Sequence, residues 1–394
     1  TAGGNYTQES ISVPQRRVIA EKTGTSFTWE ALSFDSFQQV TEAKRYSSIA
    51  GQSVIDEQTT YLNDLPHWVL SLPKQTKNLS TGEVVDDNVY DLANVTLKES
   101  WRFGQKLMTY AFDAQGQLAS FTDGNNHTTT LTNYKRGIPQ TIVTPDSKTQ
   151  SLVVDDFGQI TSLTDQAGSK TLYSYDQAGR LTGVTYPTGD EQAWLPQTFA
   201  YAYITSTEYG VPAGHWRRTA SHGDARAVTY FDALLRPILA TRSIVGTNTA
   251  DISQRTDYNW KGQTAFSSYA VAGLPARTSI TAGTTSTYDA LGRLTKTEQS
   301  SELGTLTTTT AYPAGATRVV TDPKGNVTTT TYQVFDQPSY DAVIKVVAPA
   351  GVTQTITRDL YGNPLTINQS GLYGTQSLSV SKSFTYDSAH RVCR

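Results

Sequence analysis

The stretch that decides the fold is YDQAGRL at residues 175–181, and it returns as YDALGRL at 288–294. A third copy, FDAQGQL, occupies 112–118, and a fourth, FDALLRP at 231–237, has lost its glycine. The complete copies place an aromatic residue before an aspartate, a glycine three residues after it, and a polar or basic residue next. Such recurrence is typical of a protein built from short structural repeats.

Weaker copies of the motif extend the series along the chain, and they centre on Asp35, Asp91, Asp155, Asp359 and Asp387. Degenerate copies fill the gaps in this series. At or near the place of the aspartate they have Leu62, Tyr134, Asn259, Pro313 or Gln333. The motif then occurs about fourteen times, with a mean step of about 27 residues, (387 − 35)/13, inside the usual range for repeat architectures.

The motif predicts a tight turn between two strands. Asp176 can accept hydrogen bonds from backbone N–H groups ahead of it, and Gly179 suits a left-handed turn position. Arg180 should then face Asp176 across the start of a hairpin. The residues expected to fix the turns are Tyr175, Asp176, Gly179, Arg180, Tyr288, Asp289, Gly292, Arg293, Phe112, Asp113, Gly116, Asp232 and Arg236.

Strand-forming stretches surround these turns. Segments 128–134, 170–175, 305–312 and 327–332 are rich in Thr, Tyr, Val and Leu, and no long window shows the apolar period of a helix. The sequence predicts an all-β protein. Because 327–332 reads VTTTTY, with no continuous apolar side, a single wall that is wet on both faces is favoured over a sandwich.

The number of hairpins bears on the overall shape. Fourteen hairpins contribute about 28 strands, which at roughly 4.8 Å each make a sheet about 134 Å wide. An open twisted sheet does not stay flat at that width. Rolled into one ring, it would have a diameter of about 43 Å and about 25 Å left inside after the side chains are subtracted. Side chains do not fill such a space.

These residues resemble the YD-repeat, or Rhs-repeat, family, which includes bacterial Rhs toxins, the B and C components of insecticidal toxin complexes, and animal teneurins. The resemblance covers the chain from about Phe34 onward, and VTDPKGN at 320–326 looks like the family's inter-repeat turn. It implies tandem β-hairpins that spiral into a hollow single-walled β-shell, which encloses a C-terminal toxin before delivery.

The expected organisation has two parts. Residues 1–33 are predicted to be lead-in strands of the wall, and 34–394 a shell segment with a longer irregular insertion inside 176–232, either an extended loop or an inward-pointing hairpin. The family's closing segment and cleavage site are not seen before Arg394, and the chain starts without Met. We therefore expect a partial wall from a longer or processed protein.

Composition excludes several classes of function. The chain has 32 Lys+Arg and 35 Asp+Glu, a net charge of -3, which argues against nucleic-acid binding. No apolar run is long enough to span a membrane as a helix. The single cysteine, Cys393, allows no disulfide within the chain and no cysteine-based zinc site. Near absence of cysteine favours a bacterial source.

Catalytic, metal and cofactor sites are not expected. Ser221, His222 and Asp224 have the residue types of a hydrolytic triad, but neighbours in sequence seldom meet in the required geometry. The carboxylate pairs 86–87 and 155–156 are better explained by turns than by glycosidase chemistry. The five histidines are scattered too widely for a metal site.

The sequence therefore predicts a non-enzymatic shell segment of a secreted or cell-surface-associated bacterial toxin. Its expected partners are a toxin polypeptide as cargo, the remaining shell segments and a delivery-apparatus protein. The alternative is a cell-surface adhesion or carbohydrate-binding module, in which Trp194 or Trp216 would stack on sugars. Packing of one hairpin on the next is the competing explanation for the abundant Tyr.

Overall fold

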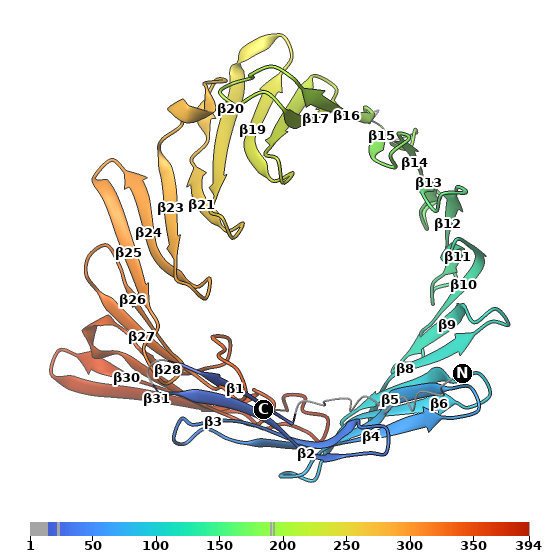
Figure 1. Ribbon diagram of the computed structural model, residues 1–394, viewed down its shortest axis with the longest axis vertical. Helices are drawn as coiled ribbons and strands as arrows, with labels where there is room; N and C mark the ends of the chain where they lie inside the picture. Colours follow the sequence, from blue (N-terminus) through green and yellow to red (C-terminus); the bar gives the residue numbers. More distant parts are fainter. Residues whose placement is uncertain (1–14, 22–23, 190, 192–193, 394) are drawn as a thin grey trace, which may run out of the picture.

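The computed structural model describes residues 15–21, 24–189, 191 and 194–393, and shows a ring of β-strands (Figure 1). One sheet contains 31 strands. Nearly every strand pairs antiparallel with the next strand in the chain; the short β22 pairs with β20, so that β21 pairs with β23. The predicted all-β, single-walled hollow shell is confirmed.

The strands of the first half are β1 (Arg16–Ala20), β2 (Ser26–Phe34), β3 (Val40–Ser47), β4 (Ile55–Asp64), β5 (Val69–Asn78), β6 (Val84–Asp91), β7 (Thr96–Arg102), β8 (Gln105–Phe112), β9 (Leu118–Asp123), β10 (Thr128–Lys135), β11 (Ile138–Val143), β12 (Thr149–Val154), β13 (Ile160–Thr164), β14 (Lys170–Tyr175), β15 (Leu181–Thr185) and β16 (Gln197–Ile204).

The second half continues with β17 (His215–His222), β18 (Ala225–Phe231), β19 (Pro237–Ile244), β20 (Thr247–Tyr258), β21 (Thr264–Ser268), β22 (Val271–Ala272), β23 (Gly283–Tyr288), β24 (Leu294–Ser301), β25 (Gly304–Ala311), β26 (Thr317–Thr321), β27 (Val327–Tyr332), β28 (Val343–Val347), β29 (Thr353–Arg358), β30 (Pro364–Tyr373) and β31 (Gln376–Ser383). Two single-turn 3₁₀ helices, η1 (Arg277–Ser279) and η2 (Pro349–Gly351), lie in connections.

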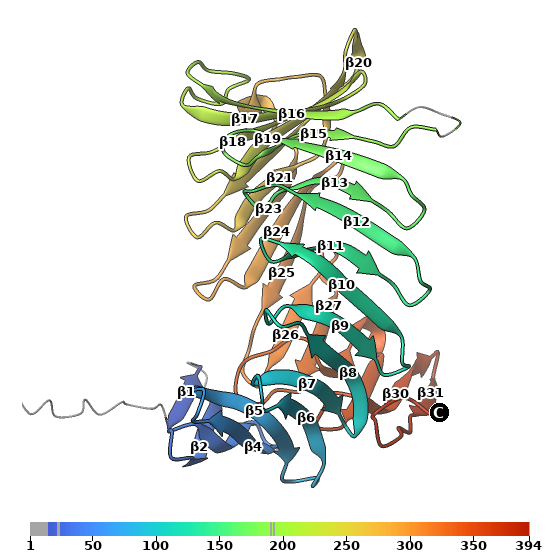
Figure 2. The ribbon, with the colours of Figure 1, turned by 90° about the vertical axis from the view of Figure 1, so that its right-hand side faces the viewer.

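The ribbon of strands has two long edges, because consecutive hairpin connections alternate between the two ends of the strands (Figure 2). All copies of the sequence motif fall on one edge, here called the motif edge. Its turns are 35–39, 65–68, 92–95, 113–117, 136–137, 155–159, 176–180, 205–214, 232–236, 259–263, 289–293, 312–316, 333–342, 359–363 and 384–391. The opposite edge includes turns 48–54, 79–83, 103–104, 124–127, 144–148, 165–169, 223–224, 245–246, 302–303 and 322–326.

The two faces of the wall differ more than the sequence predicted. Side chains directly opposite each other on paired strands share a face, and on β10 to β15 one face is largely apolar while the other is rich in Thr and Ser. The apolar pairs are Leu131↔Ile142, Leu152↔Leu163 and Tyr173↔Val184. Tyr332, in the strand expected to be wet on both faces, is buried. Side chains of neighbouring strands and turns can bury a residue such as Tyr332, and the sequence of its own strand does not show this.

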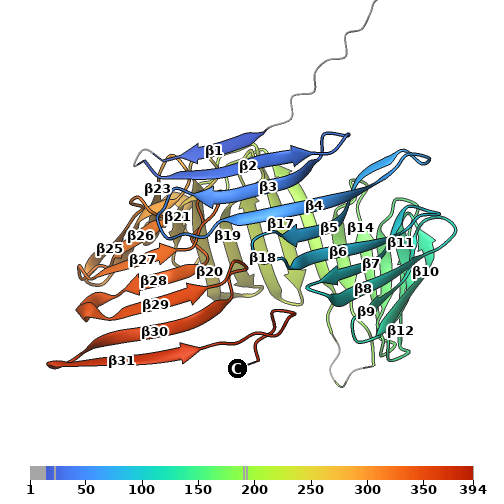
Figure 3. The same cartoon turned by 90° about the horizontal axis from the view of Figure 1, so that it is seen from below.

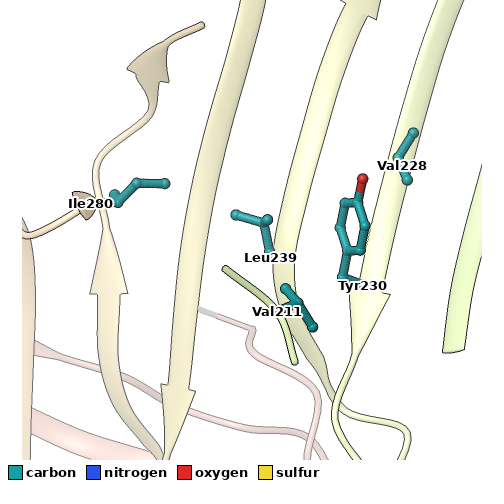
Figure 4. Close-up of a cluster of buried hydrophobic side chains, with 5 residues drawn as sticks. All are labelled: Val211, Val228, Tyr230, Leu239 and Ile280. Atoms are coloured by element: carbon teal, nitrogen blue, oxygen red, sulfur yellow. The ribbon is translucent and has the colours of Figure 1, made fainter. Parts of the chain in front are cut away.

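The predicted irregular insertion contains regular wall strands. β16 and β17 pair along their full length, and only 205–214 between them departs from a hairpin. This loop folds back on the wall, where Val211 joins Val228, Tyr230, Leu239 and Ile280 in a buried cluster (Figure 4).

The predicted lead-in segment, 1–33, is described only in part. Residues 1–14 lie outside the described residues, and β2 crosses the proposed boundary at 33. The division into two parts stays a prediction.

Candidate functional site

The motif aspartate organises its turn from inside. Asp176 Oδ1 accepts hydrogen bonds from the backbone N–H of Ala178 (3.0 Å) and of Arg180 (2.9 Å), and Oδ2 accepts one from Arg180 Nε at 2.7 Å. Gly179 donates its N–H to the Asp176 carbonyl and has a φ of 78°. The left-handed conformation explains why glycine stands there.

The same geometry recurs at most copies of the motif, although Asp91 accepts only one backbone bond, from the Ala93 N–H. The aspartate–arginine pairs are Asp176–Arg180, Asp232–Arg236, Asp289–Arg293 and Asp387–Arg391. Asp113 accepts the two backbone bonds from the N–H groups of Gln115 and Gln117, and Gln117 stands in the arginine place. Asn259, a degenerate copy, accepts the equivalent pair. Where the fourth copy lacks glycine, Leu235 adopts a φ of 59°.

The same turn geometry also occurs outside the copies of the motif, including turn 320–326, which the sequence predicted as an inter-repeat turn. Asp123, Asp165 and Asp322 accept the same two backbone bonds, although they lie on the opposite edge and have no aromatic residue before them. The signal was available, since each has a polar turn segment with glycine one or three residues later. The turn chemistry therefore serves both edges, and the aromatic residue distinguishes the motif edge.

The motif tyrosine ties each hairpin to the one before it. Tyr175 donates its hydroxyl to the Ile160 carbonyl at 2.8 Å, and Tyr288 donates to the Thr264 carbonyl at 2.9 Å. In each case the acceptor is the first strand residue after the preceding turn. The same bond is made by Tyr61, Tyr134, Tyr258, Tyr312 and Tyr386. Phe112 has the motif place but no hydroxyl to donate.

The motif arginine adds a second tie, to the following hairpin. Arg236 lies over the Tyr258 ring at 4.6 Å and Arg293 over the Tyr312 ring at 4.2 Å. Cation–π contacts of this kind contribute roughly 0.5–1 kcal/mol at partly exposed sites. Aspartate therefore orients arginine, and arginine covers the next tyrosine. This geometry favours packing as the role of the recurrent Tyr.

Asp289→Ala is expected to lower the free energy of unfolding by about 1–2 kcal/mol, because the turn loses two backbone hydrogen bonds and its partner Arg293. Asp289→Asn should cost about 0.5 kcal/mol, since Asn259 shows that an amide keeps both backbone bonds. Urea unfolding measures the difference. Equal losses in the two variants would contradict this account.

Acid should weaken the turns together. The pKa values of Asp123, Asp176 and Asp387 are lowered, first by the hydrogen bond from the backbone N–H four residues on. A lowered folded-state pKa stabilises the fold above the unfolded value of about 4, and this stabilisation is lost as pH falls through the folded value. The urea concentration at the unfolding midpoint is expected to decrease once the pH is lowered below about 4. Changing all three to Asn should reduce that dependence; an undiminished acid loss would refute the explanation.

The structure separates the residues considered for catalysis. Ser221 and His222 are neighbours on β17, so their side chains leave opposite faces of the sheet. Asp87 and Asp86 are likewise neighbours on β6, and Asp156 pairs with Lys135. Within the described part of the chain, no group of three or more His, Cys, Asp or Glu side chains could hold a metal ion.

An apolar cavity of about 350 Å³ lies beside the Asp176 turn. It is lined by Arg180, Tyr201, Trp216, Arg217, Phe231 and Leu235. The Arg180 guanidinium lies over both the Tyr201 ring, at 4.6 Å, and the Trp216 ring, at 5.4 Å. An aromatic platform for sugars needs an open face, and the Arg180 guanidinium occupies one face of the Trp216 ring. Trp194, exposed, lies 6.1 Å from the Tyr186 ring.

The wall closes on itself along a seam that the sequence did not predict (Figure 3). Phe27, near the start of the chain, is fully buried against Ala316, Tyr332 and Val334. Gln52 donates to the Tyr332 carbonyl at 3.0 Å and accepts from the Val334 N–H at 3.2 Å. A side-chain amide thus replaces the missing strand ladder between the first and last parts of the ring.

Two polar contacts extend this end of the seam. Arg17 Nη2 lies 2.6 Å from Asp336 Oδ2, and the Gly315 N–H donates to Thr25 Oγ1 at 3.3 Å. The partners are 319 and 290 residues apart in the chain. In each pair the later residue belongs to the motif edge, and the earlier one lies toward the start of the ribbon.

A second cluster holds the other end of the seam. Tyr361, from a motif-edge turn, packs edge-on against Phe103 at 4.9 Å and donates its hydroxyl to Glu83 Oε2 at 2.9 Å. Burial raises the pKa of Tyr361 to about 12. His390 packs against both rings, tilted on Phe103 and edge-on to Tyr361, with its Nε2 3.2 Å from Glu83 Oε1. Here turns 359–363 and 384–391 of the motif edge lie on opposite-edge turns 79–83 and 103–104.

Comparison with known proteins agrees with this construction. A family model described as RHS Repeat matches residues 154–191, which hold the Asp155 and Asp176 turns. Teneurin-3 of Mus musculus is 24% identical over 167 residues, 33% of this chain and 6% of the teneurin. Teneurin-1 of Gallus gallus is 23% identical over 183 residues, 37% of this chain and 6% of the teneurin. The matches span a small part of these relatives' length.

Solved structures show the same fold over most of the chain. The crystal structure of TcdB2-TccC3 superimposes with a TM-score of 0.61 at 12% identity, covering 94% of this chain and 31% of that one. The crystal structure of TcdB2-TccC3-TEV gives 0.59 at 13% identity, covering 94% and 20%. Consecutive hairpins, motif turns and a ring-shaped wall define a hollow β-shell repeat protein. Together with the family match at 154–191, they make this chain similar to the Rhs/YD-repeat shells in both its repeat and its fold.

Proposed function

We propose that the chain is a non-enzymatic wall segment of a shell that encloses a toxin polypeptide before delivery, in a secreted or cell-surface-associated bacterial protein. The observation that carries the proposal is the closed seam: side chains 278 to 319 residues apart join the two ends of a ribbon that curves into a ring. No described strand crosses the centre of the ring in Figure 1.

The similarity in fold to TcdB2-TccC3 supports two further kinds of partner, namely additional shell segments and a delivery-apparatus protein. The chain covers about a third of the TcdB2-TccC3 chain that it matches, so further shell segments would complete the enclosure. A delivery-apparatus protein would bind the completed shell. Among the described residues no helix is long and apolar enough to cross a membrane. A carbohydrate-binding function has less support, because Arg180 covers the Trp216 ring.

Protection of an attached polypeptide tests the proposal. An unstructured reporter with one cleavage site for a sequence-specific protease is fused after Arg394, and the same reporter is fused before Thr1 as the matched control. Because the remaining shell segments are absent, enclosure by this wall segment predicts partial protection, with the reporter after Arg394 cleaved more slowly than the reporter before Thr1. Equal cleavage of the two fusions would overturn the proposed function. A hydrolase activity abolished by Asp176→Ala would overturn the non-enzymatic part.

The hollow shape has its own measurement. A filled globule of 394 residues would have a radius of gyration of about 21 Å. Small-angle X-ray scattering of the ring is expected to give a clearly larger value, with the scattering minimum of a thin curved wall. A value near 21 Å would mean that the ribbon collapses on itself in solution.

A further inference from the structure

Three adjacent turns of the motif edge present large apolar side chains to solvent. Leu234, Leu235, Trp260 and Leu291 are 72%, 61%, 88% and 75% exposed, and they are called the crown here. Their turns touch: Lys261, in the turn of Trp260, donates its Nζ to the Ala290 carbonyl in the next turn. Exposed apolar residues gathered on one surface mark interaction sites more often than scattered ones do.

The turn itself does not require these apolar residues. It needs the aspartate and a residue that tolerates a positive φ, while the two positions between them are free. Three other copies hold only small or polar residues at these positions, 114–115, 177–178 and 388–389, whereas the copies at Asp35, Asp155 and Asp359 carry one aromatic residue each. The apolar cavity beside Leu235 widens the same surface toward Trp216. The turn geometry therefore does not account for the apolar side chains of the crown.

The seam shows what covers such a turn. Tyr361 is the third residue of its turn, as Leu234 and Leu291 are of theirs, and it is packed on Phe103 beside Glu83. The chain therefore already pairs its motif edge with its opposite edge, side chain against turn. The crown is the same edge further back along the ribbon, where no described part of the chain covers it.

The complementary surface lies at the other end of the same strands. Turn 245–246 joins β19 to β20, turn 302–303 joins β24 to β25, and both belong to the opposite edge. Val245 is 61% exposed and Leu303 92% exposed. A copy displaced along the strand direction would bring its opposite edge, with these two side chains, onto the crown.

We propose that the crown is the docking surface for a second copy of this chain, whose opposite edge seats Val245 and Leu303 on it. The contact joins two different patches, so it is head-to-tail, and each pair leaves one crown and one opposite edge open. Within one chain, the seam packs motif-edge turns against opposite-edge turns. The proposed contact is the same arrangement formed between two chains.

Sedimentation velocity over a concentration series tests the docking with two sets of changes. The crown variant carries Leu234→Ser, Trp260→Ser and Leu291→Ser; the edge variant carries Val245→Ser and Leu303→Ser. The wild type is expected to self-associate below roughly 100 µM, and each variant alone to associate at least tenfold more weakly. Val153→Ser, an exposed mid-strand change on β12, is the matched control and should associate like the wild type.

Mixing the two variants decides the geometry. The crown variant keeps an intact opposite edge and the edge variant keeps an intact crown, so the mixture should form a one-to-one pair with the affinity of the wild type. A mixture that stays monomeric, a wild type that is monomeric throughout, or association unaffected by both variants would each overturn the proposal. A variant without cooperative thermal unfolding is replaced by the single change Leu291→Ser or Leu303→Ser, with the same expectations.

Discussion

Phe27→Ala is expected to open the seam, with a loss of about 3–5 kcal/mol in the free energy of unfolding. The ring of Phe27 is fully buried, and its neighbours Ala316, Tyr332 and Val334 come from the far end of the ribbon. Removing it leaves a cavity at the point where the two ends are joined by side chains alone. We expect a lower urea midpoint and a larger radius of gyration, because the ends of the wall separate.

The matched control is Phe157→Ala. Phe157 is 90% exposed in a motif-edge turn, so its removal should change the unfolding free energy by less than about 0.5 kcal/mol and leave the radius of gyration unchanged. Opening of the ring is the specific claim. A Phe27→Ala protein that is destabilised but keeps the wild-type radius of gyration would show that the seam holds without this ring.

The repeat turns were predictable because their information is local. Asp176, Gly179 and Arg180 stand within five residues, and the turn needs an acceptor, a left-handed residue and a partner charge at those spacings. Even Asn259, admitted only as a degenerate copy, keeps the geometry, since an amide oxygen accepts the same two bonds. Strand type followed from the Thr and Tyr content between turns.

The seam was not predictable, because its information is distributed over the whole chain. In the sequence Gln52 is an ordinary polar loop residue. Its contact with Tyr332 follows only from the number of strands between them and from the curvature of the sheet. Tyr361 occupies a turn position that holds residues as different as Ala178, Leu234 and Phe157 in other copies, so its sequence context does not mark it. The curvature that brings these residues together depends on how each strand pair twists, which no single motif encodes. A longer insertion was predicted within 176–232, but the packing of its loop 205–214 was not, for a similar reason: Val211 is buried against β18 and β19 rather than by its sequence neighbours.

Gly283→Ala is expected to disrupt the wall between β21 and β23. A Cβ at Gly283 would overlap the Ser267 carbonyl oxygen and lie 2.5 Å from Ser268 Cα, both backbone atoms of the paired strand. Backbone cannot rotate away as a side chain can, so the strands must separate. We expect a loss of about 3 kcal/mol or more, measured by urea unfolding, and faster hydrogen exchange in β21 and β23.

Gly371→Ala isolates steric overlap from the general cost of changing a strand glycine. Gly371 lies in β30, and a Cβ there would meet Val352 Cγ2 at 3.3 Å, a side-chain atom that can shift. Replacing a strand glycine by alanine also reduces the freedom of the unfolded chain, which favours folding by roughly 0.4–1 kcal/mol. Gly371→Ala should therefore be close to neutral. If both variants lose the same unfolding free energy, the close backbone approach at Gly283 is not the reason that a side chain is excluded there. If only Gly283→Ala unfolds at a lower urea concentration, the pairing of β21 and β23 requires a residue without a Cβ at this position.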